Sequence, residues 1–123
     1  MTGVQTCALP ISRTKTADTD VVTGKWSGGR TGTLIGLRTQ PLPNQVTLFG
    51  STGYVQQKQQ KGGAPDYAPL VAQIVKFLQT GHPPVSHAET LEMYAFMEAA
   101  DESTRRGGVP VRLSEVLAMA GGK

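Results

Sequence analysis

The first half of the chain shows the two-residue period of β-strands. Residues 31–38 alternate Thr, Thr, Ile and Leu with Gly, Leu, Gly and Arg, which predicts a strand. Two valines at residues 21–22, followed by a glycine, predict an earlier strand. Residues 45–49 and 54–58 flank the loop sequence Gly-Ser-Thr-Gly and predict a β-hairpin.

A helical period begins after residue 66. Leu70, Ile74 and Phe77 recur at spacings of three and four residues, which places them on one face of a helix. Pro69 fits the first helical turn, where a missing N–H costs nothing, and Gly81 fits the left-handed residue that ends a helix. We therefore expect an amphipathic helix between these two residues.

A second helix is predicted from residue 86. In the capping box Ser-His-Ala-Glu, the hydroxyl of Ser86 accepts from the amide of Glu89, and the Glu89 carboxylate accepts from the amide of Ser86. The helix should run to about Arg106, before two glycines. Residues 109–111 then predict a short edge strand, and Ser114 predicts the cap of a final helical turn.

The fold class predicted by this order is α+β. Because strands precede helices instead of alternating with them, we expect a mostly antiparallel sheet and two principal helices. The 123 residues suit one small domain or part of a larger protein, and 15 glycines with 8 prolines indicate many turns and a modest core. No run approaches 18 apolar residues, so we expect no membrane partner.

The first 12 residues differ from the rest of the chain. Their sequence, MTGVQTCALPIS, has no periodicity, no charged side chain and none of the features of a secretion signal. It resembles the in-frame translation of a short-read sequencing adapter, so we expect residues 1–12 to be non-native and the domain to occupy residues 13–123. Cys7, the one cysteine, then lies in the non-native segment, and no redox role or cysteine-based metal site is expected.

Charge differs between the two halves of the chain. Residues 13–61 carry seven Lys or Arg and two Asp, whereas residues 62–123 carry five basic and seven acidic residues. The basic residues are spread over several segments instead of one stripe, so nucleic acid is not expected as a partner. His82 and His87 lie on either side of a Pro-Pro pair without further ligands at helical spacing, so no metal site is expected.

One glycine-rich stretch approaches the pattern of a phosphate-binding loop. Residues 24–31 read GKWSGGRT, with Arg30 at the position where such a loop has lysine. A phosphate-binding loop leads into a helix N-terminus, whereas here a strand pattern follows. The stretch is therefore interpreted as a β-turn.

The predicted second helix also carries a group of charged residues. Glu98, Asp101 and Glu102, with Arg105 and Arg106, give pairs at spacings of three and four residues. Such pairs are typical of an exposed helix face. We therefore interpret them as ion pairs and not as catalytic acids.

Four sequence segments occur in a recognisable order. The first two are GRTGTLIGLR (residues 29–38) and FGSTGYV (residues 49–55). The third is YAPLVAQIVKFLQTGHPPVSHAETLEMYAFMEAADEST (residues 67–104), and the fourth is GGVPVRLSEV (residues 107–116). Together they resemble the C-terminal domain of the glucose–fructose oxidoreductase, inositol dehydrogenase and rhizopine-catabolism family (Gfo/Idh/MocA).

The resemblance implies the substrate side of an NAD(P)-dependent oxidoreductase of a sugar, cyclitol or related polyol. The family's Rossmann domain, with its G-x-G-x-x-G loop, and its Glu-Lys-Pro motif have no counterpart in this sequence. We therefore expect a truncated C-terminal domain that binds no NAD or NADP and is inactive alone. The intact parent would use NAD or NADP and form a homo-oligomer through the sheet.

Two residues are candidates for the substrate side of the intact enzyme. Arg30 lies on a turn between predicted strands, and Tyr67 opens a predicted helix. In the alternative interpretation, Arg30 is an exposed turn residue and Tyr67 packs on the sheet. No catalytic, cofactor-binding or metal-binding residue is assigned.

A second class of function is a small α+β protein-interaction module without catalytic activity, which would use the hairpin edge and the amphipathic helices.

For either function, we expect the isolated chain to be marginally stable or to aggregate, because an incomplete sheet and unpaired helices expose apolar surface. The compartment is left open: the cytoplasm is only the default, because an export signal would belong to the lost upstream segment.

Overall fold

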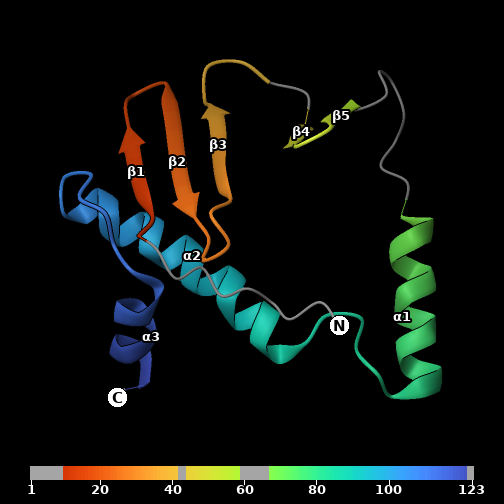
Figure 1. The fold of residues 1–123 in the computed structure, drawn as a ribbon. Coiled ribbons are helices and arrows are strands. Elements are labelled where there is room, and N and C mark those ends of the chain that lie inside the picture. Colours follow the sequence, from red (N-terminus) through yellow and green to blue (C-terminus); the bar gives the residue numbers. More distant parts are fainter. Residues whose placement is uncertain (1–9, 42–43, 59–66, 122–123) are drawn as a thin grey trace. The chain divides into compact units, whose positions relative to one another are not determined.

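The computed structural model describes residues 10–41, 44–58 and 67–121 (Figure 1). The strands in these ranges are β1 (Ser12–Lys15), β2 (Thr19–Lys25), β3 (Thr31–Leu37), β4 (Gln45–Gly50) and β5 (Gly53–Lys58), and the helices are α1 (Ala68–Thr80), α2 (His87–Arg105) and α3 (Leu113–Gly121). The fold is α+β, as predicted, and the strands pair antiparallel. The chain divides into two units, here called the first unit (residues 10–40 and 85–121) and the second unit (41, 44–58 and 67–84).

The sheet of the first unit has the strand order β1-β2-β3. Its register pairs Arg13 with Val22, and Val22 with Leu34. The strand β1 was not predicted from the sequence. The short strand predicted at residues 109–111 is wrong: a single bridge joins Val111 to Ile11, and the amide of Arg13, which would continue the ladder towards Val109, donates to Ser103 Oγ instead.

The core of the first unit lies between one face of this sheet and α2, with α3 against α2 (Figure 1). Trp26 and Phe96 pack against this core and are partly buried. The buried apolar residues are Ile11, Val22, Ala95, Ala99, Ala100, Val111, Leu113 and Val116. Ile11 lies before the predicted domain start at residue 13 but has no exposed surface, so the segment adjoining β1 contributes to the core.

The second helix begins as the sequence predicts. The amide of Glu89 donates to Ser86 Oγ over 3.2 Å, and the amide of Ser86 donates to Glu89 Oε2 over 2.9 Å. Small residues face the sheet on α2, which lets the helix approach the strands closely, whereas Met93 and Met97 are exposed. The spacing in the sequence offers two apolar faces, one with Met93, Phe96, Met97 and Ala100 and one with Leu91, Ala95 and Ala99, and the buried alanines come from both.

The third helix begins one residue before its predicted cap. Leu113 is its first residue and is buried, so Ser114 lies inside the helix and is exposed. At this end, the amide of Arg112 donates to a carboxylate oxygen of Glu115 over 3.3 Å. Glu115 therefore supplies the carboxylate of a capping box at the third helical position, and Ser114 is not the residue that precedes the helix.

The hairpin of the second unit pairs Leu48 with Val55 and Phe49 with Tyr54. The prediction of a hairpin is confirmed, but its loop is two residues long, since Gly50 and Gly53 belong to the strands. No apolar side chain of the described hairpin residues is buried.

The helix of the second unit begins after Tyr67, with Pro69 in its first turn. It ends at Gly81, which has the left-handed φ of 69° and donates its N–H to the carbonyl of Phe77 over 2.7 Å. Both predicted end signals of α1 are confirmed. None of its residues is buried, so its apolar stripe is exposed in the structure.

Candidate functional site

The two candidate residues lie in different units. Arg30 ends the turn between β2 and β3, and its carbonyl accepts from the amide of Trp26 over 2.9 Å. The turn is closed by Gly29, which has a φ of +78° and donates its N–H to the Trp26 carbonyl over 2.9 Å. Tyr67 is the N-terminal flanking residue of α1 and is 63% exposed.

The glycine-rich stretch forms a β-turn, as interpreted from the sequence. It joins two antiparallel strands and does not lead into a helix, so its amides lack the helix N-terminus that a phosphate-binding loop provides. At the start of α2, the amides of Ser86 and Glu89 are hydrogen-bonded to each other's side chains. The turn at residues 24–31 therefore lacks the strand–loop–helix geometry of a phosphate-binding loop.

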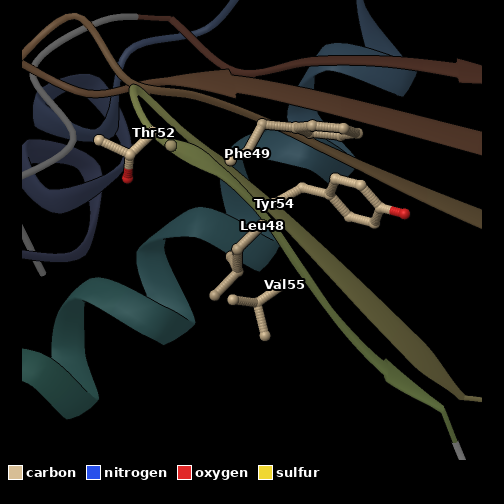
Figure 2. Close-up of a pocket in the computed structure, with 7 residues that line it drawn as sticks. Leu48, Phe49, Thr52, Tyr54 and Val55 are labelled. Carbon is tan, nitrogen blue, oxygen red and sulfur yellow. The ribbon is translucent and has the colours of Figure 1, made fainter.

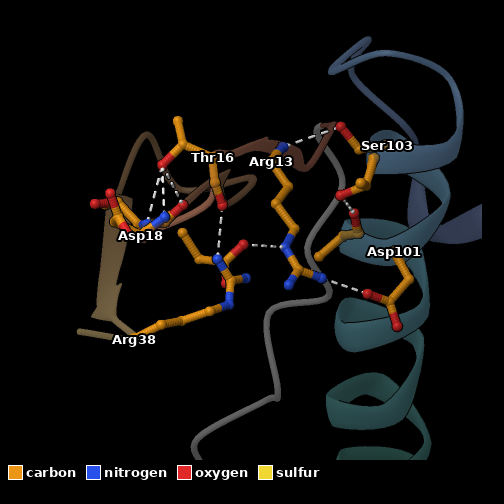
Figure 3. A network of polar contacts seen from close by, with 10 residues as sticks. Arg13, Thr16, Asp18, Arg38, Asp101 and Ser103 are labelled. Atoms are coloured by element: carbon orange, nitrogen blue, oxygen red, sulfur yellow. Dashed lines mark hydrogen bonds and ion pairs between the residues drawn. The ribbon is translucent and has the colours of Figure 1, made fainter. Parts of the chain in front are cut away.

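A network of charged side chains ties β1 to its neighbours (Figure 3). Arg13 Nε donates to Asp20 Oδ1 of β2 over 2.9 Å, and Arg13 Nη1 bonds to Asp101 of α2. The backbone amide of Arg13 donates to Ser103 Oγ over 3.0 Å. Ser103 has no exposed surface, so this hydroxyl fixes β1 against the buried side of α2.

The same network continues to the residue that follows β3. Arg38 bonds to the second oxygen of Asp20 and donates to the Thr16 carbonyl over 2.8 Å. The hydroxyl of Thr16 accepts from the amide of Thr19 over 3.0 Å and shapes the turn between β1 and β2 (Figure 3). Asp20 thus lies between two guanidinium groups.

The lowered pKa of Asp20 indicates that this network stabilises the fold and does not supply a general acid or base. The hydrogen bond from Arg13 is the main cause that lowers the pKa of Asp20, and the charges of Arg13, Arg38 and Lys15 act in the same direction, while burial opposes them. A general acid or base works best with a pKa near the working pH. Asp20 is ionised and paired at neutral pH, which suits it to holding strands together.

A second charged group connects α2 to α3. Glu102 accepts from Arg105 Nε over 2.6 Å and from Arg106 Nε over 2.7 Å, and both bonds lower its pKa. Arg106 also pairs with Glu115 over 3.0 Å. The prediction of ion pairs is confirmed here, but Asp101 bonds to Arg13 of β1, and Glu102 keeps only 14% of its side-chain surface exposed.

The hairpin carries an open apolar hollow of about 430 Å³ (Figure 2). Its lining residues are Leu48, Phe49, Gly50, Thr52, Gly53, Tyr54 and Val55. The rings of Phe49 and Tyr54 lie on one side of the hairpin, with centroids 6.2 Å apart, and Leu48 and Val55 lie on the other. Since no carboxylate, imidazole or amine lines the hollow, its chemistry suits contact with an apolar surface.

Two kinds of feature are absent from the described ranges. No group of three or more His, Cys, Asp or Glu residues there is arranged to hold a metal ion. His82 Nδ1 lies 2.8 Å from the Thr80 carbonyl, and His87 is the first residue of α2. None of the helices in these ranges is long and apolar enough to cross a membrane.

The network around Arg13 was missed by sequence reasoning. Its key pair, Arg13 and Asp20, is seven residues apart, and the two side chains meet only because the register sets Arg13 opposite Val22. The sequence signal for β1 is weak. Residues 13–16 read Arg-Thr-Lys-Thr, and a strand made only of polar residues shows no alternation of apolar and polar positions.

Comparison of the chain with protein-family models, with curated proteins and with solved structures gave no match in any of the three. Function is therefore inferred from the residues and from the geometry that the described part of the chain adopts.

Proposed function

We propose that this chain is the C-terminal, substrate-side part of an NAD(P)-dependent oxidoreductase of the Gfo/Idh/MocA family, acting on a sugar, cyclitol or related polyol. In this proposal the dinucleotide and the catalytic residues belong to a preceding Rossmann domain, because the sequence has neither a G-x-G-x-x-G loop nor a Glu-Lys-Pro motif. The chain alone is then inactive.

The observation that carries the proposal is how the four resembling segments fall on the secondary structure. Residues 29–38 cover the end of the turn and β3, and residues 49–55 span the loop of the β4–β5 hairpin. Residues 67–104 cover α1 and nearly all of α2, and residues 107–116 cover the Ile11 bridge partner and the start of α3. Each segment thus includes at least part of a helix or strand of an α+β chain.

The outer face of the first unit's sheet supports the homo-oligomer part of the proposal. One face of this sheet packs on α2, and the register puts Val21 and Ile35 together on the other face. Ile35 is 62% exposed, next to the short hydroxyl side chain of Thr23 on the same face. A flat, partly apolar sheet face of this kind suits contact with a second copy.

The test is to recover the coding sequence upstream of residue 13 and to express the joined protein. We expect NAD- or NADP-dependent oxidation of a polyol by the joined protein and none by the present chain. In the joined protein, Tyr67→Phe should raise KM for the polyol, with Tyr94→Phe as the control because Tyr94 is equally exposed, at 64%. Arg30→Ala, with Arg112→Ala as its control, tests the other candidate in the same assay.

Dinucleotide binding can be tested on the present chain. Calorimetric titration with NAD and with NADP should give no heat of binding. Micromolar binding of either would show that the chain holds its own dinucleotide site, and the division of roles proposed here would be wrong.

A protein-interaction module is the second candidate, and the exposed hairpin favours it. Phe49 is 85% exposed and Tyr54 is 70% exposed, and two neighbouring aromatic side chains with this exposure suit contact with a partner. The upstream coding sequence separates the two candidates. A Rossmann half joined in frame supports the oxidoreductase, whereas a start codon immediately before the first strand supports the module.

A further inference from the structure

We draw no further inference here: the strongest candidate, the apolar stripe of α1 on which Leu70, Ile74 and Phe77 are exposed, carries none because nothing in the structure shows what covers it.

Discussion

The indole of Trp26 stacks on the ring of Phe96, with centroids 6.3 Å apart and ring planes inclined by 16°. The contact joins the turn between β2 and β3 to the middle of α2. Room for it comes from Gly24 and Gly32, which face each other across the two strands. A Cβ atom at Gly32 would lie 3.0 Å from Trp26 Cζ3, so the missing side chain is what lets the indole lie over the sheet.

The first prediction concerns Gly24→Ala. A Cβ there would lie 3.0 Å from both Ile11 Cδ1 and Phe96 Cε2, inside a buried cluster that has little freedom to move. We expect the free energy of unfolding to fall by about 1–3 kcal/mol, the usual cost of overpacking a core. Urea unfolding followed by the fluorescence of Trp26, the one tryptophan, measures it.

Gly36→Ala is the matched control. Gly36 lies in β3 of the same sheet, and a Cβ there would meet no heavy atom within 4 Å. Its free energy of unfolding should stay within about 0.5 kcal/mol of the parent, as for most surface changes. Equal losses in the two variants would mean that contact with Ile11 and Phe96 is not the cause.

The second prediction concerns the buried hydroxyl of Ser103. Ser103→Ala leaves the amide of Arg13 without its acceptor, which should cost about 1–3 kcal/mol of stability. Ser114→Ala is the control, because Ser114 is exposed on α3. Both are measured by the same urea unfolding. If the two variants unfold at the same urea concentration, the hydroxyl of Ser103 does not hold β1 in place.

Local signals in the sequence were sufficient to predict the helices whose ends carry a recognisable capping residue. The capping box of Ser86 and Glu89 and the left-handed Gly81 were readable because each acts within one helical turn. The alternation in residues 31–38 could be recognised because the two-residue period of a strand involves only neighbouring residues. In each case, the residues that decide the structure are near neighbours in the chain.

Contacts between distant residues were not readable from the sequence. The strand β1 depends on Ser103, which lies 90 residues after Arg13, and the buried face of α2 depends on which side meets the sheet. Periodicity offered two apolar faces without deciding between them, whereas close approach to the strands buries the alanines of both. The candidate site was limited in the same way, since nothing local links Arg13 with Asp101.

The third prediction concerns the pH dependence of stability. Because the folded pKa of Asp20 is lowered, the unfolded chain binds a proton at Asp20 at a higher pH than the folded chain does. The stabilisation is therefore fully present above the ordinary aspartate pKa, about 4, and is lost as pH falls through the folded value. Lowered pKa values at Glu89, Glu102 and Glu115 act in the same direction.

Asp20→Asn tests the contribution of Asp20 to that loss. The variant should be less stable than the parent at pH 7, and the difference in stability should narrow as pH falls below about 4 and the parent loses its ion pairs. Thermal unfolding at a series of pH values measures this. Asp18→Asn is the control, since no ion pair within the described residues involves the exposed Asp18. A gap that stays constant with pH would count against the ion pairs.

The fourth prediction concerns the difference in protection between α1 and α2. No residue of α1 is buried, and an isolated helix of 13 residues is marginal in water, whereas α2 packs on the sheet through Ala95 and Ala99. Hydrogen exchange measured by mass spectrometry at low micromolar concentration should therefore show rapid exchange along α1 and slow exchange along the middle of α2. The amides of β2, paired on both sides, should also exchange slowly.

If α1 is protected from exchange after all, the dependence of that protection on protein concentration identifies its cause. If α1 becomes protected only as the protein concentration rises, its exposed Leu70, Ile74 and Phe77 are being covered by another copy, which agrees with the expected tendency of the chain to associate. Ile74→Lys should then restore rapid exchange at every concentration, because a charge on the stripe opposes burial. Strong protection of α1 at all concentrations would mean that the helix is packed within one molecule, and the prediction would be wrong.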